Sequence, residues 1–158
     1  MHPNRAWIEA HIPHHGRMCL LDEVVNWSSE RISCRSGGHR AADHPLRAHG
    51  RLGVACGIEF AAQAMAVHGA LIADALIADA LIANAPDAKP PAGFLASVRG
   101  VRLHVARLDD VQSDLICDAL RIAGGQGTTL YEFEVRSATM PLLSGRATVL
   151  DANFRRDP

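Results

Sequence analysis

The feature that most constrains the fold is one long apolar run without proline, which begins at Val54 and ends before Pro86. The run is rich in Ala, Leu and Ile, and it stops there because the residue before a proline resists the helical conformation. It therefore predicts a single long helix. Small residues fill the first turns, which lets another backbone pack very close, as when a sheet wraps around a central helix. They are Gly57, Ala61, Ala62, Ala64 and Ala66.

After this helix the sequence turns to alternating, β-branched segments joined by short connections typical of hairpins. Four strands are predicted in succession, over residues 94–105, 111–122, 128–135 and 142–150. Strands of this kind beside one long helix predict an α+β domain, in which an antiparallel sheet packs one face on the helix. At 158 residues the chain is predicted to be one domain, 1–158.

The segment before the helix is more irregular. Residues 12–27 predict a loop that leads into an edge strand or a short helix, and residues 32–35 alternate like a short strand. The polar stretch 37–53 predicts a loop of about seventeen residues, longer than a compact domain normally keeps without a functional reason.

A five-residue repeat fills the second half of the predicted helix, with ALIAD at 70–74, ALIAD at 75–79 and ALIAN at 80–84. Five residues advance a helix by about 500°, so the Leu-Ile pairs of successive units cannot share one face. Two interpretations stay open. The repeat is either a duplication tolerated in a projecting helix end or an extension that binds a partner.

Composition narrows the class of protein. Hydrophobic residues make up 48% and charged residues 21%, as in a folded domain, and the formal net charge of −1 gives no reason to expect nucleic acid or anionic lipid as a partner. The N-terminus lacks the apolar core of a signal peptide, and Asp74 and Asp79 argue against a membrane span. The four cysteines lack metal or redox spacing, so a reducing compartment, the cytoplasm, is expected.

Three motifs, in order, resemble one known family. Pro13-His14 and Leu20-Leu21-Asp22 are similar, without a gap, to P-H-x-x-x-x-L-L-V-D. Residues 59–63 (EFAAQ) are similar to the helix signature E-A-x-A-Q, and residues 97–102 (SVRGVR) to the strand V-x-F-R-x-P without its proline. The family is that of the bacterial 3-hydroxyacyl-[acyl-carrier-protein] dehydratases, and the likeness is greatest to its accessory branch in aryl polyene pigment pathways. The resemblance covers roughly residues 12–151 and implies the hotdog fold, a curved antiparallel sheet around a central helix.

The resemblance also implies an activity, the dehydration of a 3-hydroxyacyl thioester on acyl carrier protein without a cofactor or a metal. It implies a catalytic histidine and a helix carboxylate from different subunits, hence a homodimer, a larger homo-oligomer or a heteromer with a second hotdog chain. In this sequence they are His44 and Glu59. Their spacing is one residue longer than in the family, so His49, which is closer to the helix, is the alternative base.

Elimination of water needs three kinds of group. A histidine of near-neutral pKa suits the base, and a carboxyl in apolar surroundings suits the acid. Backbone N–H groups at the helix start, from Gly53 to Gly57, suit the developing enolate oxygen. Glu59 and Gln63 share one helical face among apolar residues, which favours a role in the site, although a structural hydrogen-bonding role stays open for Glu59.

The other histidines receive structural interpretations. His14, beside Pro13, is predicted to hydrogen-bond and fix the loop over a substrate tunnel, as part of the substrate-binding set. His68 lies nine residues after Glu59, so it faces the opposite side of the helix and is predicted to be packed or at an interface. His39, His44 and His49 recur every five residues, a spacing that could suggest a metal site. A loop gives no reason for the three rings to point at one another, so no metal site is predicted.

Arg99, Arg102 and Arg107 form a local positive cluster. In a regular strand Arg99 and Arg107 would face one way and Arg102 the other. The cluster is either ordinary sheet surface or a dock for the phosphopantetheine phosphate or the acidic helix of a carrier protein, and Arg99 is the substrate-binding candidate within it.

Two further functions stay open. The shifted loop is compatible with a non-catalytic acyl-binding partner subunit of a heteromeric dehydratase. A hotdog acyl thioesterase would use the same helix carboxylate to activate water.

Overall fold

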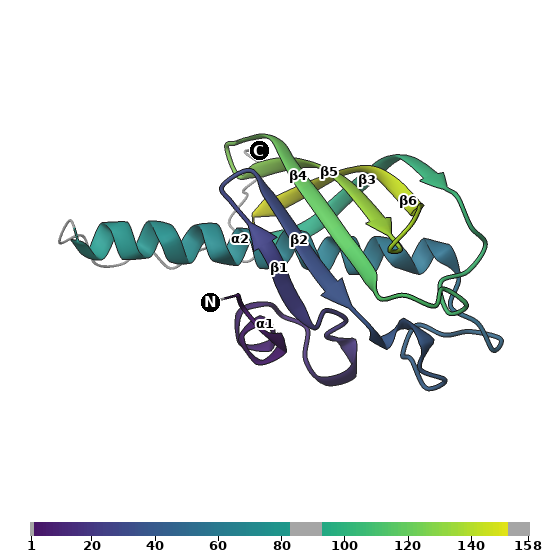
Figure 1. The fold of residues 1–158 in the computed structure, drawn as a ribbon. Coiled ribbons are helices and arrows are strands. Elements are labelled where there is room, and N and C mark those ends of the chain that lie inside the picture. Colours follow the sequence, from purple (N-terminus) through teal and green to yellow (C-terminus); the bar gives the residue numbers. More distant parts are fainter. Residues whose placement is uncertain (1, 83–92, 152–158) are drawn as a thin grey trace.

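The computed structural model describes residues 2–82 and 93–151 (Figure 1). A short helix and two strands come first, then one long helix, and then four strands. The helices are α1 (Arg5–His11) and α2 (Gly57–Ile82); the strands are β1 (Glu23–Trp27), β2 (Arg31–Ser36), β3 (Gly93–Leu103), β4 (Leu115–Gly125), β5 (Thr128–Arg136) and β6 (Pro141–Asp151).

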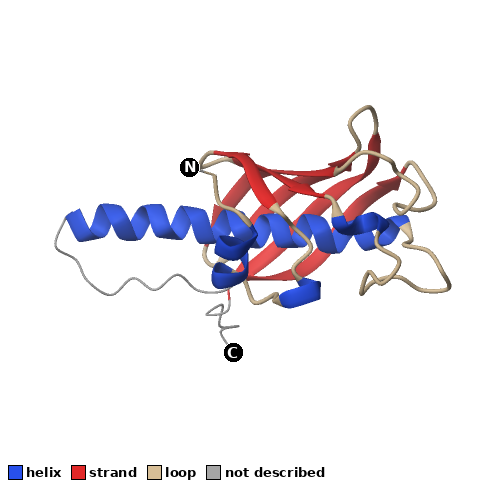
Figure 2. Cartoon of the chain, turned by 60° about the horizontal axis from the view of Figure 1, so that its bottom comes forward, coloured by secondary structure: helices blue, strands red, loops and turns tan. Residues whose placement is uncertain are grey.

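The six strands form one antiparallel sheet in the order β1-β2-β4-β5-β6-β3. The sheet curves around the first half of α2, which crosses one of its faces (Figure 2). This is the predicted α+β hotdog arrangement, and the four strands after the helix are confirmed. β1 and β3 form the two edges, so the expected edge strand within residues 12–27 is also confirmed.

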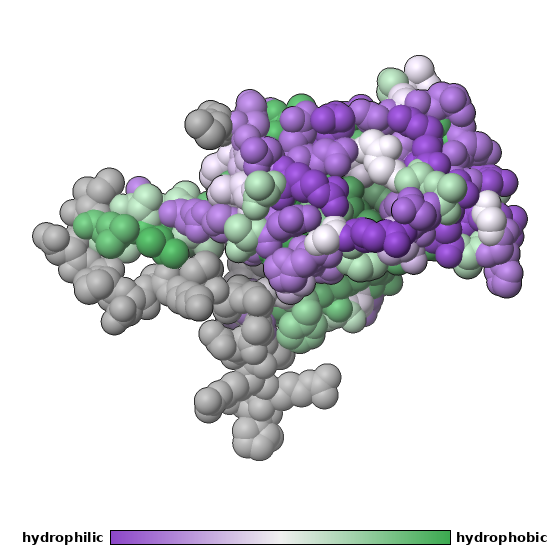
Figure 3. All heavy atoms as spheres, turned by 90° about the horizontal axis from the view of Figure 1, so that it is seen from below, coloured by the Kyte–Doolittle hydropathy of each residue, from purple (hydrophilic) through white to green (hydrophobic). Residues whose placement is uncertain are grey.

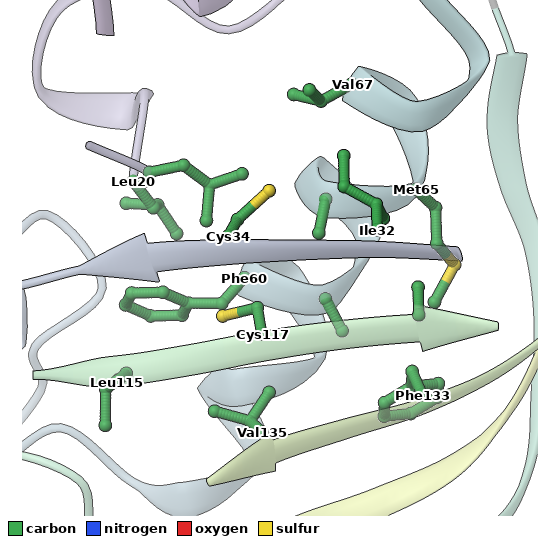
Figure 4. Close-up of a cluster of buried hydrophobic side chains, with 14 of the residues drawn as sticks. Leu20, Ile32, Cys34, Phe60, Met65, Val67, Leu115, Cys117, Phe133 and Val135 are labelled. Carbon is green, nitrogen blue, oxygen red and sulfur yellow. The ribbon is translucent and has the colours of Figure 1, made fainter. Parts of the chain in front are cut away.

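The core lies between α2 and the sheet. Phe60 is fully buried there, among apolar side chains from β2, β4 and β5 (Figure 4). The small residues Ala61 and Ala64 are fully buried as well. A Cβ on Gly57 would lie only 2.3 Å from Cδ2 of Leu143 on β6. The small-residue helix start therefore allows the close approach of the sheet, as predicted.

Two boundaries differ from the prediction. α2 begins at Gly57 because the Val54 N–H donates to the Ala106 carbonyl at 3.2 Å and residues 54–56 form a 3-10 turn. β4 begins at residue 115, four residues late, because the preceding segment is a loop in which Asp109 and Asp114 form ion pairs with arginines. Residues 83–85, the predicted end of the helix, lie outside the described residues.

The short helix α1 is not among the elements predicted from the sequence. The Asn4 side chain caps this helix by accepting a hydrogen bond from the Trp7 N–H at 3.1 Å, and Ile8 is fully buried. An asparagine before a short segment with one apolar anchor is the capping signal that could have found it.

β3 is irregular at Gly100, which has a φ of +59°. The register with β6 shifts between Arg99 and Arg102, so an extra residue is accommodated there. These two arginines consequently lie on the same face of the sheet, and the expectation that they face opposite ways is wrong. Arg107 lies beyond the end of the strand.

The second half of α2 projects beyond the sheet (Figures 1 and 2). Leu71 is 6% exposed, whereas Leu76 and Leu81 are 62% and 63% exposed. Figure 3 shows hydrophobic side chains on this projecting part, residues 72–81, which we call the arm. The second and third repeat units, as far as residue 82, therefore lie in a projecting helix end, whereas Leu71 of the first unit is packed.

One described helix, Val54–Leu81, is long and apolar enough to cross a membrane by length and composition alone. A central helix packed on a sheet passes the same test, and the first half of this helix is packed in that way.

Candidate active site

Glu59 lies in the first turn of α2 and has two nitrogen neighbours. Its Oε1 is 3.0 Å from His14 Nε2 and 3.0 Å from Gln63 Nε2. The His14 and Glu59 side chains are 30% and 34% exposed. Glu59 and Gln63 therefore meet on one helical face, as predicted, and His14 joins them from the loop before β1. This last contact could not be predicted from the sequence, because the direction of a side chain in a loop follows no local pattern.

The second nitrogen of His14 suggests where the ring carries its proton. His14 Nδ1 is buried and has no hydrogen-bond partner among the described residues. An unpaired acceptor is tolerated in a protein interior more readily than an unpaired N–H group. The neutral ring is therefore best assigned with its proton on Nε2, where it donates to the Glu59 carboxylate.

Gln63 connects the helix to the loop that carries His14. Its Oε1 accepts from the Leu20 N–H at 2.8 Å, and its Nε2 donates to the Met18 carbonyl at 2.8 Å. The side chain is fully buried, so these bonds compensate for its desolvation. Gln63 thus fixes the loop against α2 and so helps to place His14 over Glu59.

His44 packs against Phe60, the residue that follows Glu59 in α2. It is 8% exposed, and its ring stacks on Phe60 with centroids 5.7 Å apart. Burial lowers the pKa of His44, and the neighbouring His39 and Arg47 act in the same direction. The Leu46 N–H donates to His44 Nδ1 at 3.2 Å, which assigns the proton of the neutral ring to Nε2.

A nearly buried carboxylate holds the loop of His44 against the helix start. Asp109 is 4% exposed; its Oδ2 lies 3.0 Å from Arg47 Nη2, and its Oδ1 accepts from the Leu52 N–H at 2.9 Å. Arg107 completes the cluster, and its hydrogen bonds hold the pKa of Asp109 well below the usual range. Asp109 was not predictable from the sequence, since no local pattern indicates that residues 47 and 109 lie close together.

The structure does not bring the remaining candidates to Glu59. His49 is exposed at the tip of a turn, with a φ of +53°. Gly53 pairs with Arg107 and leads into the 3-10 turn before α2, and Arg99 is exposed on the edge strand β3. His39 is buried and binds the main chain instead, with Nε2 2.9 Å from the Val111 carbonyl. Within residues 2–82 and 93–151 no group of three potential metal ligands occurs.

His68 is packed, as predicted. It is fully buried, with Nδ1 2.9 Å from the Tyr131 hydroxyl and Nε2 2.7 Å from the Ser28 carbonyl. Burial lowers its pKa, so the ring is neutral and ties α2 to β5 and to the turn after β1.

A groove of about 470 Å³ lies beside α2, beyond the site. Its helix wall is made mainly of small and apolar residues, among them Ala66, Gly69 and Ala73. The opposite wall comes from the ends of β5 and β6 and from Gly93 at the start of β3. This face of α2 is therefore not covered by the described part of its own chain.

A family model described as ApeP dehydratase matches residues 6–157. The chain belongs to the ApeP-like dehydratase family. This confirms the resemblance to dehydratases of the accessory branch. A search of curated protein sequences found no match.

Solved structures support the same fold. The chain is similar to one in the dehydratase heterocomplex ApeI:P from Xenorhabdus doucetiae, with a TM-score of 0.77, 23% identity, and coverage of 92% of this chain and 91% of that one. It is also similar to AziG of S. sahachiroi, with a TM-score of 0.54, 13% identity, and coverage of 81% of this chain and 88% of that one. A mutant of the thioesterase PA1618 from Pseudomonas aeruginosa matches with a TM-score of 0.53, 13% identity, and coverage of 82% of this chain and 81% of that one. At these identities the likeness shows the hotdog fold.

Proposed function

We propose that this chain dehydrates a 3-hydroxyacyl thioester, held on acyl carrier protein, to the 2-enoyl thioester. The observation that carries the proposal is the arrangement at the start of α2. There, His14 and Gln63 orient the Glu59 carboxyl group, and a buried neutral His44 stacks on the adjacent Phe60. Membership of a dehydratase family supports the reaction class.

In this proposal His44 removes the proton from C2, and Glu59 protonates the departing C3 hydroxyl, which leaves as water. In the structure described, His44 Nδ1 accepts a hydrogen bond from the Leu46 N–H. For Nε2 to accept a proton, the ring proton must first lie on Nδ1, so that bond has to be lost when substrate binds. The N–H groups of Gly53 and Ala55 have no acceptor among the described hydrogen bonds, and they are our candidate donors to the enolate oxygen.

The proposal requires a second hotdog chain. No hydrogen bond or ion pair joins His44 to Glu59 among the described residues of one chain. In addition, the Glu59 side chain is 34% exposed, and a carboxyl group that keeps its proton needs to be more fully shielded from water. The edge strand β3 has unpaired backbone groups along its outer side and exposed apolar side chains, with Phe94 54% and Leu103 53% exposed. Such an edge favours pairing with the same strand of another chain into a continuous sheet.

The carrier protein brings an acidic helix and a phosphate. Arg99 and Arg102 lie on one face of β3, and we propose that face as the dock for these anionic groups. A carrier-bound substrate and four free cysteines both fit the cytoplasm, which we propose as the location.

Replacement of Glu59 by glutamine tests the reaction. Glu59→Gln keeps the shape and an oxygen for His14 but removes the transferable proton, so the dehydration rate of a 3-hydroxyacyl-carrier substrate falls by about 10²-fold or more. Folding survives, since the amide leaves no unpaired buried charge. His44→Ala gives a comparable loss, and His49→Ala, an exposed control, has little effect. Normal rates in both the Glu59 and the His44 variants would refute the assignment.

A second candidate is a non-catalytic acyl-binding subunit. It is favoured by the likeness to a chain from a dehydratase heterocomplex. In that case the chain alone is inert, and a second hotdog chain restores a rate that does not depend on Glu59 or His44. Hydrolysis of acyl thioesters without formation of the enoyl product would instead identify a thioesterase.

A further inference from the structure

Asp109 joins two segments that both lead to the proposed active site. It lies in the loop between β3 and β4, and its side chain is 4% exposed. Its Oδ2 is 3.0 Å from Arg47 Nη2, and its Oδ1 accepts a hydrogen bond from the Leu52 N–H at 2.9 Å. Arg47 follows His44 by three residues, and Leu52 directly precedes Gly53. One carboxylate therefore binds both the segment of the candidate base and the segment of a candidate donor to the enolate oxygen.

The main chain beside Asp109 is itself anchored to the segment before α2. The Leu108 N–H donates to the Leu52 carbonyl at 2.8 Å, and both of these residues are fully buried. The Val54 N–H donates in turn to the Ala106 carbonyl at 3.2 Å. The carboxylate thus projects from a support that is fixed to the start of the helix.

The loop of the candidate base has few other polar links to its surroundings. Three side-chain polar contacts connect residues 43–51 to other parts of the described chain. One is the pair of Arg17 with Asp43, whose side chains are 64% and 82% exposed, and such a pair contributes little. Another is a contact of 3.8 Å from the Cys56 thiol, a weak donor. The contact with Asp109 is the one that combines burial with full charges.

Stability alone does not account for this buried pair. Hydrogen bonds from Arg107 keep the pKa of Asp109 well below its usual range, so the carboxyl group stays ionised at neutral pH. Removing two charged groups from water costs free energy, and apolar residues of similar volume often stabilise a fold equally well. An ion pair adds a defined geometry, since a guanidinium binds a carboxylate in few orientations. The pair therefore fits a role in fixing the loop at one position.

We propose that Asp109 is a positioning residue, which acts through Arg47 to hold His44 and the N–H groups at the start of α2 in one geometry. The inference rests on the proposed function. Neither Asp109 nor Arg47 has to touch the substrate in this role. A displacement of a reacting group by about 1 Å can lower the rate about 10²-fold, even when the altered residue is remote from the chemistry.

The two arginines of this carboxylate provide matched variants. Arg47 belongs to the loop of His44, whereas Arg107 does not, and both bind Asp109. Arg47→Met should lower kcat for dehydration about tenfold or more and leave KM within about threefold, because the reacting groups shift and the acyl-binding surfaces do not. Arg107→Met should leave kcat within about twofold. Asp109→Asn should resemble Arg47→Met, and the double variant should be no slower than the slower single one, because both changes remove the same link.

Amide hydrogen exchange of the full chain without substrate measures the link independently of activity. In Asp109→Asn and Arg47→Met, exchange in residues 44–53 should become about tenfold faster or more, while residues 60–67 of α2 keep their protection. Leu71→Ala, which weakens the core away from this loop, is the control for general destabilisation and should not show the local change. If Asp109→Asn does not fold, Arg47→Lys, which keeps the charge but loses the planar fork, should give an intermediate effect on both exchange and kcat.

Unchanged exchange and unchanged kcat in Asp109→Asn and Arg47→Met would overturn the proposal. Equal losses of kcat in Arg47→Met and Arg107→Met would also overturn it, because the charge of the cluster and not the link to the loop would then matter. Faster loop exchange in a chain that is inert both alone and with a second hotdog chain would refute the proposed function alone. An active enzyme whose loop is unaffected by these variants would refute this inference alone.

Discussion

The two halves of α2 are both largely apolar but have very different surroundings. In the first half, Phe60 and Ala64 are fully buried under the curved sheet. In the second half, Leu76 and Leu81 are more than half exposed, although they belong to the same ALIA repeat as Leu71, which is 6% exposed. The contrast shows that the length of the covering sheet determines how much of an apolar helix is buried.

The polar contacts of the two halves differ in the same way. In the first half, Glu59 and Gln63 are locked to the loop before β1 by several hydrogen bonds, one of them fully buried. In the arm, Asp74 has a 3.5 Å contact with His11, and 45% of its side chain is exposed. A surface ion pair of this kind contributes little, whereas the buried network fixes the geometry of a site.

The largest expected effect comes from matched leucines in adjacent repeat units. Leu71→Ala should lower the free energy of unfolding by about 2–5 kcal/mol, because it opens a cavity against the sheet. Leu76→Ala should change it by only about 0.5 kcal/mol, as is usual for surface positions. Urea denaturation, followed by the fluorescence of Trp7 and Trp27 at a concentration where the chain is monomeric, measures both. Similar losses in the two variants would mean that the arm is packed within its own chain.

A second comparison concerns the two histidine–carboxylate pairs, His14 with Glu59 in the first half of α2 and His11 with Asp74 in the arm. His14→Ala removes the N–H donor from Glu59 and should lower the dehydration rate about tenfold, since one hydrogen bond to a charged group contributes about 1.5 kcal/mol or more. His14→Gln can keep a donor and should recover part of the rate, and the pH profile should shift in the alanine variant. His11→Ala, which removes the arm pair, is the control and should leave the rate unchanged. If both alanine variants are equally impaired, the effect is a general one on the N-terminal segment.

Acid should weaken the body of the protein through its buried histidines. Burial lowers the pKa of His39, His44 and His68 below 6.5, so below that pH the unfolded chain binds more protons than the folded one. The free energy of unfolding should therefore fall as the pH drops from 7.5 to 5.5, by up to about 1.4 kcal/mol per pH unit for each histidine. Urea titrations at several pH values measure the slope. His68→Gln should flatten it, and a variant of the exposed His15 should not.

The smallest effect is expected from shortening the arm. Deletion of residues 75–79 removes one repeat unit and leaves Glu59 and its partners in place. At a concentration where the chain is monomeric, the deletion should lower the free energy of unfolding of the wild-type chain by about 1 kcal/mol or less, as is usual outside the core. Denaturation curves of the two chains give the difference. Collapse of the fold after the deletion would show that the arm is an integral part of the domain.

The sequence by itself determined the elements that follow from periodicity and from chain breakers. A proline-free run of helix formers, small residues at its start and four alternating segments were enough for the long helix and the antiparallel sheet beside it. The hotdog fold followed from the resemblance of three motifs to a known family. The pair Glu59 and Gln63 was also predictable, because a spacing of four residues brings two side chains to one helical face whatever the rest of the chain does.

Only the tertiary structure decided the contacts that join distant segments. The hydrogen bond of His14 to Glu59, the clamp of Gln63 on residues 18 and 20, and the cluster of Asp109 with Arg47 all connect loops whose directions no local pattern encodes. The bulge at Gly100 reversed the face of Arg102, since one extra residue changes the side of every residue that follows. The exposure of the arm is also decided by the tertiary structure. The units at 70–74 and 75–79 have the same sequence, yet Leu71 is covered by the rest of the chain and Leu76 is not.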